Sequence, residues 1–144
     1  MNRRDLQKKA LGLTGELLRE KGHVAFVDVF AKLGYLDQED YEAWRHGRIP
    51  FLERAIKVNL GTINFVMKTI IKNSRNGRLR ESVTNYHSWG KGRRTQLRFS
   101  KTGDPAVERA YATHFLLPSK PMPENAGAEQ AGVADPRQSS GGKP

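Results

Sequence analysis

The sequence predicts a mainly α-helical domain that carries a small β-hairpin, or wing, and ends in a disordered tail. Apolar residues recur at helical spacing through most of the first half of the chain. Residues 82–100 are rich in residues that favour strands and surround a Gly-Lys-Gly turn. Residues 119–144 are rich in Pro, Gly, Ser, Ala and Gln, and cannot bury enough surface to offset their ordering entropy. We therefore expect a folded domain over residues 1–118, with its hairpin at 79–101, and a disordered tail over 119–144.

The first expected element is a helix that ends at Lys21. Asn2 can cap its start, and Asp5 stands in the capping-box position. Gly22 provides a left-handed stop. Four apolar residues at steps of three and four then share one face, which predicts that this face is buried: Leu6, Ala10, Leu13 and Leu17.

Two short helices are expected next. Asp28 is a plausible N-cap for a helix over residues 29–33, which Gly34 would end. Asp37 is the next predicted cap, because the residues after it place negative charge in a first turn, where the helix dipole favours it. That helix should run to about residue 46 and close at Gly47.

The longest periodic pattern follows Pro50, a residue that suits the opening of a helix. Its apolar residues keep steps of three and four and form one stripe, which we interpret as core: Leu52, Ile56, Leu60, Ile63, Met67 and Ile70. Gly61 lies inside the pattern, so one long helix and two shorter helices both remain open.

The second half of the domain should contain the hairpin and a last helix. Residues 82–89 and 95–100 are expected to pair as strands, although a helix over 81–89 remains an alternative. Asp104 followed by Pro105 predicts the start of the last helix, which Pro118 would stop. The expected buried face of that helix consists of Val107, Ala110, Tyr111 and His114.

The charge of the chain is strongly uneven. The formal net charge is +10, and residues 68–101 hold ten Lys and Arg against one Glu, a balance of +9. Residues 1–67 and 102–144 contribute +2 and −1. A local cluster almost free of acidic residues is typical of a protein that binds phosphate. We therefore expect a non-enzymatic nucleic-acid-binding protein, with DNA favoured over RNA.

The candidate phosphate-binding residues are nine of the ten basic side chains of this stretch together with two arginines near the third helix. They are Arg45, Arg48, Lys72, Arg75, Arg78, Arg80, Lys91, Arg93, Arg94, Arg98 and Lys101. The hypothesis requires the basic side chains of the second half to converge on one surface. Tyr86, Trp89 and Phe99 interleave with these charges, which suits stacking on single-stranded bases, but packing of the hairpin on the helices is the more frequent role of such residues.

Residues 24–56 resemble the helix-turn-helix of repressor-type and excisionase-type DNA-binding proteins. The resemblance is carried by Ala31-Lys32-Leu33-Gly34, by Tyr41, and by Trp44-Arg45-x-Gly47-Arg48-Ile49-Pro50-x-Leu52. It implies that the first turn of the second helix contacts bases, through Gln38, Glu39, Tyr41 and Glu42. The sequence departs from this pattern because acidic residues crowd that turn, where they would repel phosphate. Trp44 and Tyr41 are then expected in the core.

Other functions have weaker support in the sequence. The chain has no cysteine, which excludes disulfides, thiolate zinc sites and cysteine nucleophiles. A metal-dependent nuclease would have to use the unorganised cluster of His87, His114, Glu81, Asp104 and Glu108, which lacks a metal-binding signature. We therefore expect no catalytic residues, no metal and no cofactor.

The main alternative is a protein-interaction adaptor within a larger nucleoprotein complex. An apolar helix face that the domain does not cover would give a homodimer or bind a protein partner. No apolar run reaches the roughly 18 to 20 residues that a membrane crossing needs. We expect no membrane contact and a cytoplasmic location.

Overall fold

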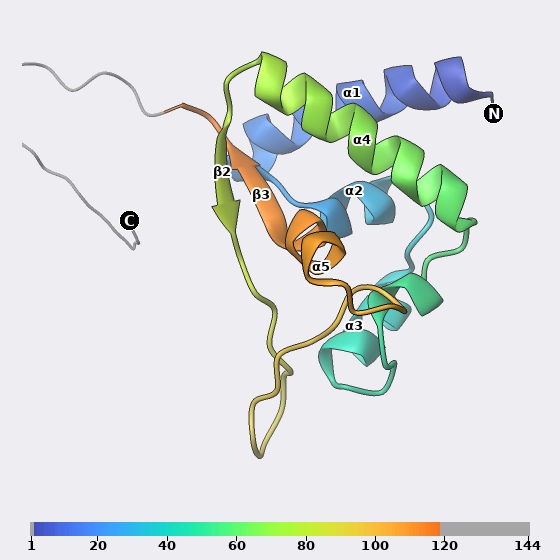
Figure 1. Cartoon of the computed structure of the whole chain (residues 1–144), viewed down its shortest axis with the longest axis vertical. Helices are drawn as coiled ribbons and strands as arrows, with labels where there is room; N and C mark the ends of the chain where they lie inside the picture. The colour runs from blue at the N-terminus through green and yellow to red at the C-terminus, as the bar shows by residue number, and fades with distance from the viewer. Residues whose placement is uncertain (1, 119–144) are drawn as a thin grey trace, which may run out of the picture.

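The computed structural model describes residues 2–118, and the expected disordered tail, residues 119–144, lies outside this range. The described chain is mainly helical with a small antiparallel sheet, in agreement with the predicted fold class (Figure 1). The elements in chain order are α1 (Arg3–Lys21), β1 (His23–Val24), α2 (Phe26–Lys32), α3 (Gln38–Arg45), the single 3₁₀ turn η1 (Leu52–Arg54), α4 (Leu60–Asn76), β2 (Arg80–Val83), α5 (Pro105–Ala112) and β3 (Thr113–Leu116).

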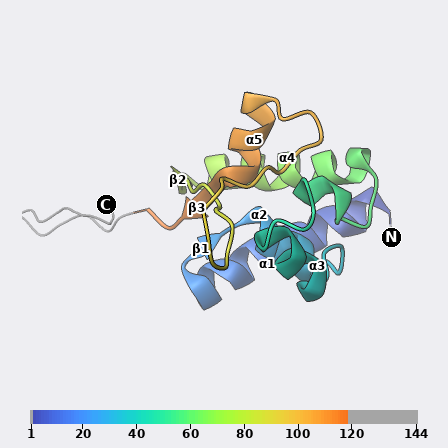
Figure 2. The same cartoon turned by 90° about the horizontal axis from the view of Figure 1, so that it is seen from below.

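Helix α1 confirms the prediction for the N-terminal segment. The side chain of Asn2 accepts a hydrogen bond from the Asp5 backbone amide at 2.9 Å, so Asn2 caps the helix. Gly22 ends it with φ at 79°, a left-handed angle that glycine adopts without steric cost. All four apolar residues of the predicted face are buried, and α4 packs across this face (Figure 2).

Helix α2 begins earlier than predicted. Ala25 is its N-cap, and Asp28 lies in the first turn, where its carboxylate accepts a hydrogen bond from Lys21 Nζ at 2.9 Å. The predicted cap at Asp28 was therefore wrong. Phe26 is 1% exposed, and starting the helix at this residue places its ring in the core, which is worth more than one capping hydrogen bond. Helix α3 matches its predicted span, although the Asp37 carboxylate pairs with Lys57 and makes no capping bond.

The long periodic segment after Pro50 forms η1 and α4, with a break between them. Asn59 caps α4 by accepting a hydrogen bond from the Thr62 amide at 2.8 Å, so this pattern contains a helical turn and a helix rather than one continuous helix. Five residues of the apolar stripe are buried, and Leu60, at the first position of α4, is 54% exposed. The stripe is core, as predicted, because the chain bends at the break and both parts face the same interior.

The sheet differs from the predicted hairpin. Its order is β1-β3-β2, and β2 pairs antiparallel with β3, with Glu81 opposite Phe115. The expected pairing of residues 82–89 with 95–100 is reduced to one bridge between His87 and Gln96 and backbone bonds beside it. Strand β2 pairs with β3 because this pairing helps to bury Phe115, which is 1% exposed, whereas β2 has no buried residue of its own.

The last helix is shorter than predicted. Asp104 and Pro105 start α5 as expected, with the Val107 amide donating to Asp104 Oδ2 at 3.2 Å. The helix ends at Ala112, and Thr113–Leu116 is strand β3, so the expectation that His114 lies on a helix was wrong. Buried and half-buried residues alternate along β3, and this period of two favours a strand over a helix.

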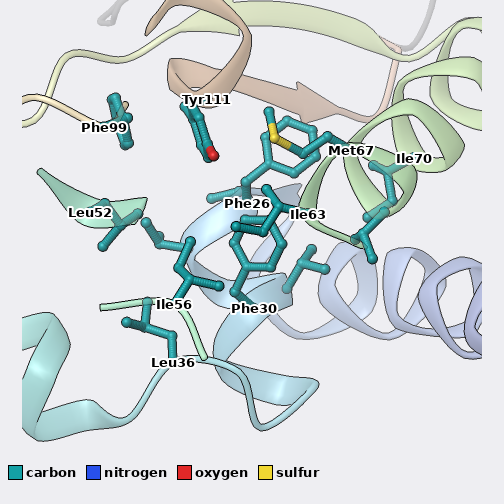
Figure 3. Close-up of a cluster of buried hydrophobic side chains, with 14 of the residues drawn as sticks. Phe26, Phe30, Leu36, Leu52, Ile56, Ile63, Met67, Ile70, Phe99 and Tyr111 are labelled. Carbon is teal, nitrogen blue, oxygen red and sulfur yellow. The ribbon is translucent and has the colours of Figure 1, made fainter. Parts of the chain in front are cut away.

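The core lies between α1, α2, α4 and β3, and it extends to α3 and η1 through aromatic side chains. Figure 3 shows Phe26 and Phe30 of α2 near Ile63 and Met67 of α4, with Tyr111 of α5 above them. Among residues 2–118, no helix combines the length and the apolar character needed to span a membrane.

Candidate nucleic-acid interface

The loop that joins β2 to α5 forms an irregular hairpin whose two arms are fixed to the helical domain. The Trp89 amide donates to the Arg45 carbonyl at the end of α3, at 2.6 Å. On the other arm, the Arg98 carbonyl accepts from the Trp44 indole at 2.9 Å and from the Leu52 amide at 3.1 Å. The base of the hairpin is therefore rigid, while its tip extends away from the helices (Figure 1).

Two glutamates hold the turn that follows the second arm. Glu108 of α5 accepts hydrogen bonds from the Phe99 amide at 2.8 Å and the Ser100 amide at 2.7 Å, and also from the Ser100 hydroxyl. Glu53 accepts from the Lys101 amide at 2.9 Å and from the Tyr111 hydroxyl at 2.7 Å. Burial, together with this bond to Glu53, raises the pKa of Tyr111. Both carboxylates are therefore occupied by hydrogen bonds within the fold.

The tip of the hairpin presents its basic residues to solvent. Gly90 and Gly92 have φ of 106° and 100°, which side chains other than glycine rarely adopt, so the chain reverses here. Lys91, Arg93 and Arg94 are all exposed. The sequence prediction that these three residues project from a loop tip agrees with their exposure.

A pocket of about 430 Å³ lies between the hairpin and the segment that follows α3. Its basic or aromatic lining residues are His46, Trp89, Lys91, Arg93 and Arg98. Ser88, Thr95 and Gln96 add polar side chains, and no aspartate or glutamate lines the pocket. The pocket is therefore suited to an anionic ligand with a planar group.

Trp89 stands at this pocket and is 42% exposed. The Arg45 guanidinium lies over the indole ring at 4.6 Å and over the Tyr86 ring at 5.0 Å, while Arg45 Nε is buried without a hydrogen-bond partner. The rings of Tyr41 and His46 contact the indole edge to face, at 5.9 and 5.8 Å between centroids. The Arg45 guanidinium thus packs against both Trp89 and Tyr86.

The fold divides the predicted basic residues into two groups. The hairpin group consists of Arg45, Arg48, Lys91, Arg93, Arg94, Arg98 and Lys101. The α4 group consists of Lys72, Arg75, Arg78 and Arg80, and it extends to Lys68. Figure 1 shows the C-terminal end of α4 and the hairpin tip at opposite ends of the molecule, so the expectation of a single converging surface was wrong. Residues near in sequence are separated because β2 carries the chain along the sheet between them.

Within the hairpin group, Arg98 is largely occupied. Its guanidinium donates to the carbonyls of Ser100 and Lys101, both at 2.9 Å, and lies 5.6 Å from the centre of the Phe51 ring. Arg48 is exposed near the end of α3. Arg48 and the tip residues are therefore the members best placed to reach phosphate.

The α4 group lies on and beside a different cavity. Lys68 and Lys72 line a cavity of about 350 Å³ with the side-chain amides of Gln7, Asn73 and Asn76. Arg75 is paired with Glu81, with its Nε and Nη2 atoms at 3.1 and 3.3 Å from the two carboxylate oxygens. Glu81 raises the pKa of Arg75 and offsets its charge. Arg80 donates to the Leu117 carbonyl at 3.5 Å.

The surface that the helix-turn-helix resemblance assigns to base contacts is acidic in the structure. Glu39 and Glu42 of α3 are exposed, and Glu42 accepts a hydrogen bond from Gln38 at 2.9 Å. Trp44 is 0% exposed, which agrees with the expected core role, and Tyr41 is half-buried against Trp89. The basic part of this segment is the C-terminal end of α3, where it meets the hairpin.

Sequence reasoning missed His46 as a pocket residue, and it named Trp89 for base stacking only together with Tyr86 and Phe99. Tyr86 and Phe99 are buried, as the packing interpretation of the aromatic residues predicts, but Trp89 is not. The signal for Trp89 was its place directly before the Gly-Lys-Gly-Arg-Arg tip, where a hairpin leaves the domain. Nothing in the sequence indicated that His46 would face the same pocket.

The residues considered for a metal-dependent nuclease site have other partners within the fold. Asp104 caps α5, Glu108 binds the turn at residues 99–100, and Glu81 pairs with Arg75. His114 Nε2 lies 3.0 Å from the Tyr86 hydroxyl. Within residues 2–118 there is no group of three or more His, Asp or Glu side chains that could hold a metal ion.

No family model, no curated protein and no solved structure matches this chain. We therefore infer the function from the geometry and charge of the hairpin and its pocket.

Proposed function

We propose that this chain is a nucleic-acid-binding protein, with DNA favoured over RNA, that holds the phosphate backbone with its hairpin group. The single observation that carries the proposal is the 430 Å³ pocket, whose lining includes three Lys or Arg side chains and no carboxylate. Exposed cations continue from this pocket to the tip at Arg93 and Arg94.

The overall charge supports the same partner. With a formal net charge of +10, the chain attracts polyanions over a long range, and the release of counterions from a nucleic acid would favour binding. Arginine at a loop tip donates several hydrogen bonds in one plane, which fits phosphate, and it can enter a narrow minor groove of DNA. This last property is the reason for favouring DNA.

The hairpin residues have two different roles, contact with phosphate and support of the loop. Lys91, Arg93 and Arg94 contact phosphate, while Arg98 uses its donors on the backbone of the following turn. Because the base of the hairpin is already fixed, only the tip residues need to become ordered on binding. The conformational entropy lost on binding is therefore smaller. The α4 group provides a second, separate basic surface.

The protein-interaction alternative depended on an apolar stripe left uncovered by the domain. Five of its six residues are buried inside the described chain, and only Leu60 is exposed. This burial favours nucleic-acid binding over the adaptor alternative.

The test is the double substitution Arg93→Gln and Arg94→Gln, with affinity for a DNA duplex measured by fluorescence anisotropy over a range of salt concentrations. Loss of two phosphate contacts should weaken binding to all sequences about equally. It should also reduce the slope of log K against log salt by about 2, since each phosphate contact contributes about 0.9.

The matched control removes the same charge from α1 by Arg4→Gln and Lys8→Gln, two exposed residues. This control should leave the slope within about 0.5 of the original. Equal slopes for the hairpin variant and the unchanged protein would contradict the proposal. If Lys68→Gln and Lys72→Gln reduced the affinity and the salt slope instead, the binding surface would lie on α4.

A further inference from the structure

We propose that the pocket beside Trp89 takes an unpaired nucleobase of single-stranded DNA, which stacks on the indole. This inference rests on the proposed function and adds to it the strand state that the site selects.

Trp89 is both exposed and held in place. A tryptophan that is 42% exposed leaves apolar surface in water, which its burial by a ligand would remove. The indole cannot turn freely, because Arg45, Tyr41 and His46 all contact its ring. Its own backbone amide is bonded to the end of α3. Because the indole is already ordered, binding a base requires no additional loss of entropy to order this side chain.

The composition and size of the pocket also fit a nucleobase. Its volume of about 430 Å³ falls in the range of roughly 300 to 1,000 Å³ that small-molecule sites occupy. Thr95 and Gln96 supply polar groups of the kind that reach base edges, and Lys91 and Arg93 stand where flanking phosphates need positive charge. An aromatic platform beside a basic groove is the usual combination in proteins that bind single strands.

A stacking site for one base distinguishes single strands from duplexes. In a duplex, both faces of each base are covered by its neighbours, so a base can stack on a side chain only after it leaves the helix, at a cost of a few kcal/mol. The same step costs much less free energy in a single strand. The pocket should therefore favour single strands, whereas the exposed tip residues bind phosphate in either form.

The experiment uses the full chain and three probes of equal length: oligodeoxythymidine, a strand of abasic deoxyribose phosphates, and a duplex. Trp44 and Trp89 are the two tryptophans of the chain, and Trp44 is 0% exposed, so quenching by a bound base in the unchanged protein reports on Trp89. Oligodeoxythymidine should quench its emission, and the abasic strand should not. Trp89→Ala should then weaken binding of oligodeoxythymidine by about 5- to 150-fold, the equivalent of roughly 1 to 3 kcal/mol for one stacked base, and change the other two affinities by less than about twofold.

The conservative variant Trp89→Phe separates stacking from a general role in the hairpin, because phenylalanine keeps an aromatic face. It should retain most of the affinity for oligodeoxythymidine. If Trp89→Ala weakened all three probes equally, or none of them, the inference would be overturned. A chain that bound no probe even at low salt would refute the proposed function itself, whereas binding that depends on Arg93 and Arg94, with an oligodeoxythymidine affinity that Trp89→Ala leaves unchanged, would refute this inference alone.

Discussion

Replacing Glu108 with alanine should destabilise the protein by about 3 kcal/mol, a large effect for one half-buried glutamate in the first turn of a helix. The carboxylate accepts three hydrogen bonds from residues 99 and 100. Ser100 is 1% exposed, so without Glu108 its amide and hydroxyl would remain buried without this acceptor. Hydrogen bonds to a charged group are worth about 1.5–3 kcal/mol each, but three bonds that share one carboxylate are not additive, which gives the lower total.

The assay is urea denaturation followed by far-ultraviolet circular dichroism. With a slope of about 2 kcal/mol per molar urea, the midpoint should fall by about 1.5 M. Glu108→Gln keeps the size of the side chain but turns a donor toward one of the amides, so its loss should be intermediate.

The control is Glu20→Ala, which removes an exposed carboxylate 3.2 Å from Lys32 Nζ. Surface ion pairs contribute about 0–1 kcal/mol, and Glu16 still pairs with Lys32 in this variant. If Glu108→Ala cost no more than Glu20→Ala, the argument that Glu108 anchors the second arm of the hairpin would fail.

Two further predictions concern buried groups near the hairpin. Burial, and then the neighbouring His23, lowers the pKa of His114 from 6.5 to about 4. The unfolded chain therefore binds the proton more tightly, so stability that is present above pH 6.5 should be lost as the pH falls toward 4, by up to roughly 3 kcal/mol. Denaturation at several pH values should show this loss of stability, and His114→Phe should remove the part of the loss that His114 causes. An unchanged pH profile in this variant would exclude His114 as the cause. Trp44→Phe should cost about 2 kcal/mol in thermal or urea denaturation, because it loses buried volume and the indole bond to the Arg98 carbonyl. A cost below about 0.5 kcal/mol would mean that this bond and this packing contribute little.

The helices could be predicted where a local signal and the final packing agree. Asn2, Gly22 and Gly34 set ends of α1 and α2 through local backbone geometry, which depends on few neighbours. The start of α2 was mispredicted because Asp28 had two options, to cap the helix or to bind Lys21, and the burial of Phe26 decided between them. Local propensity carries no information on that competition.

The strands were less predictable because their partners lie far away in sequence. Residues 80–83 favour an extended form, but only the folded chain places them against residues 113–116. The same limit applies to the site. The tip residues Arg93 and Arg94 were found from composition, whereas the support of Trp89 by Arg45 and the facing position of His46 depend on the contact between α3 and the hairpin.

Residues a few positions apart, together with composition, are enough to predict the helical class, the buried faces of α1 and α4 and the location of the excess positive charge. Folding of the whole chain then splits this charge between two ends of the molecule and leaves one tryptophan exposed beside one of them. Charge and exposure at a surface depend on which distant segments pack together, and burial of the shared core sets that packing.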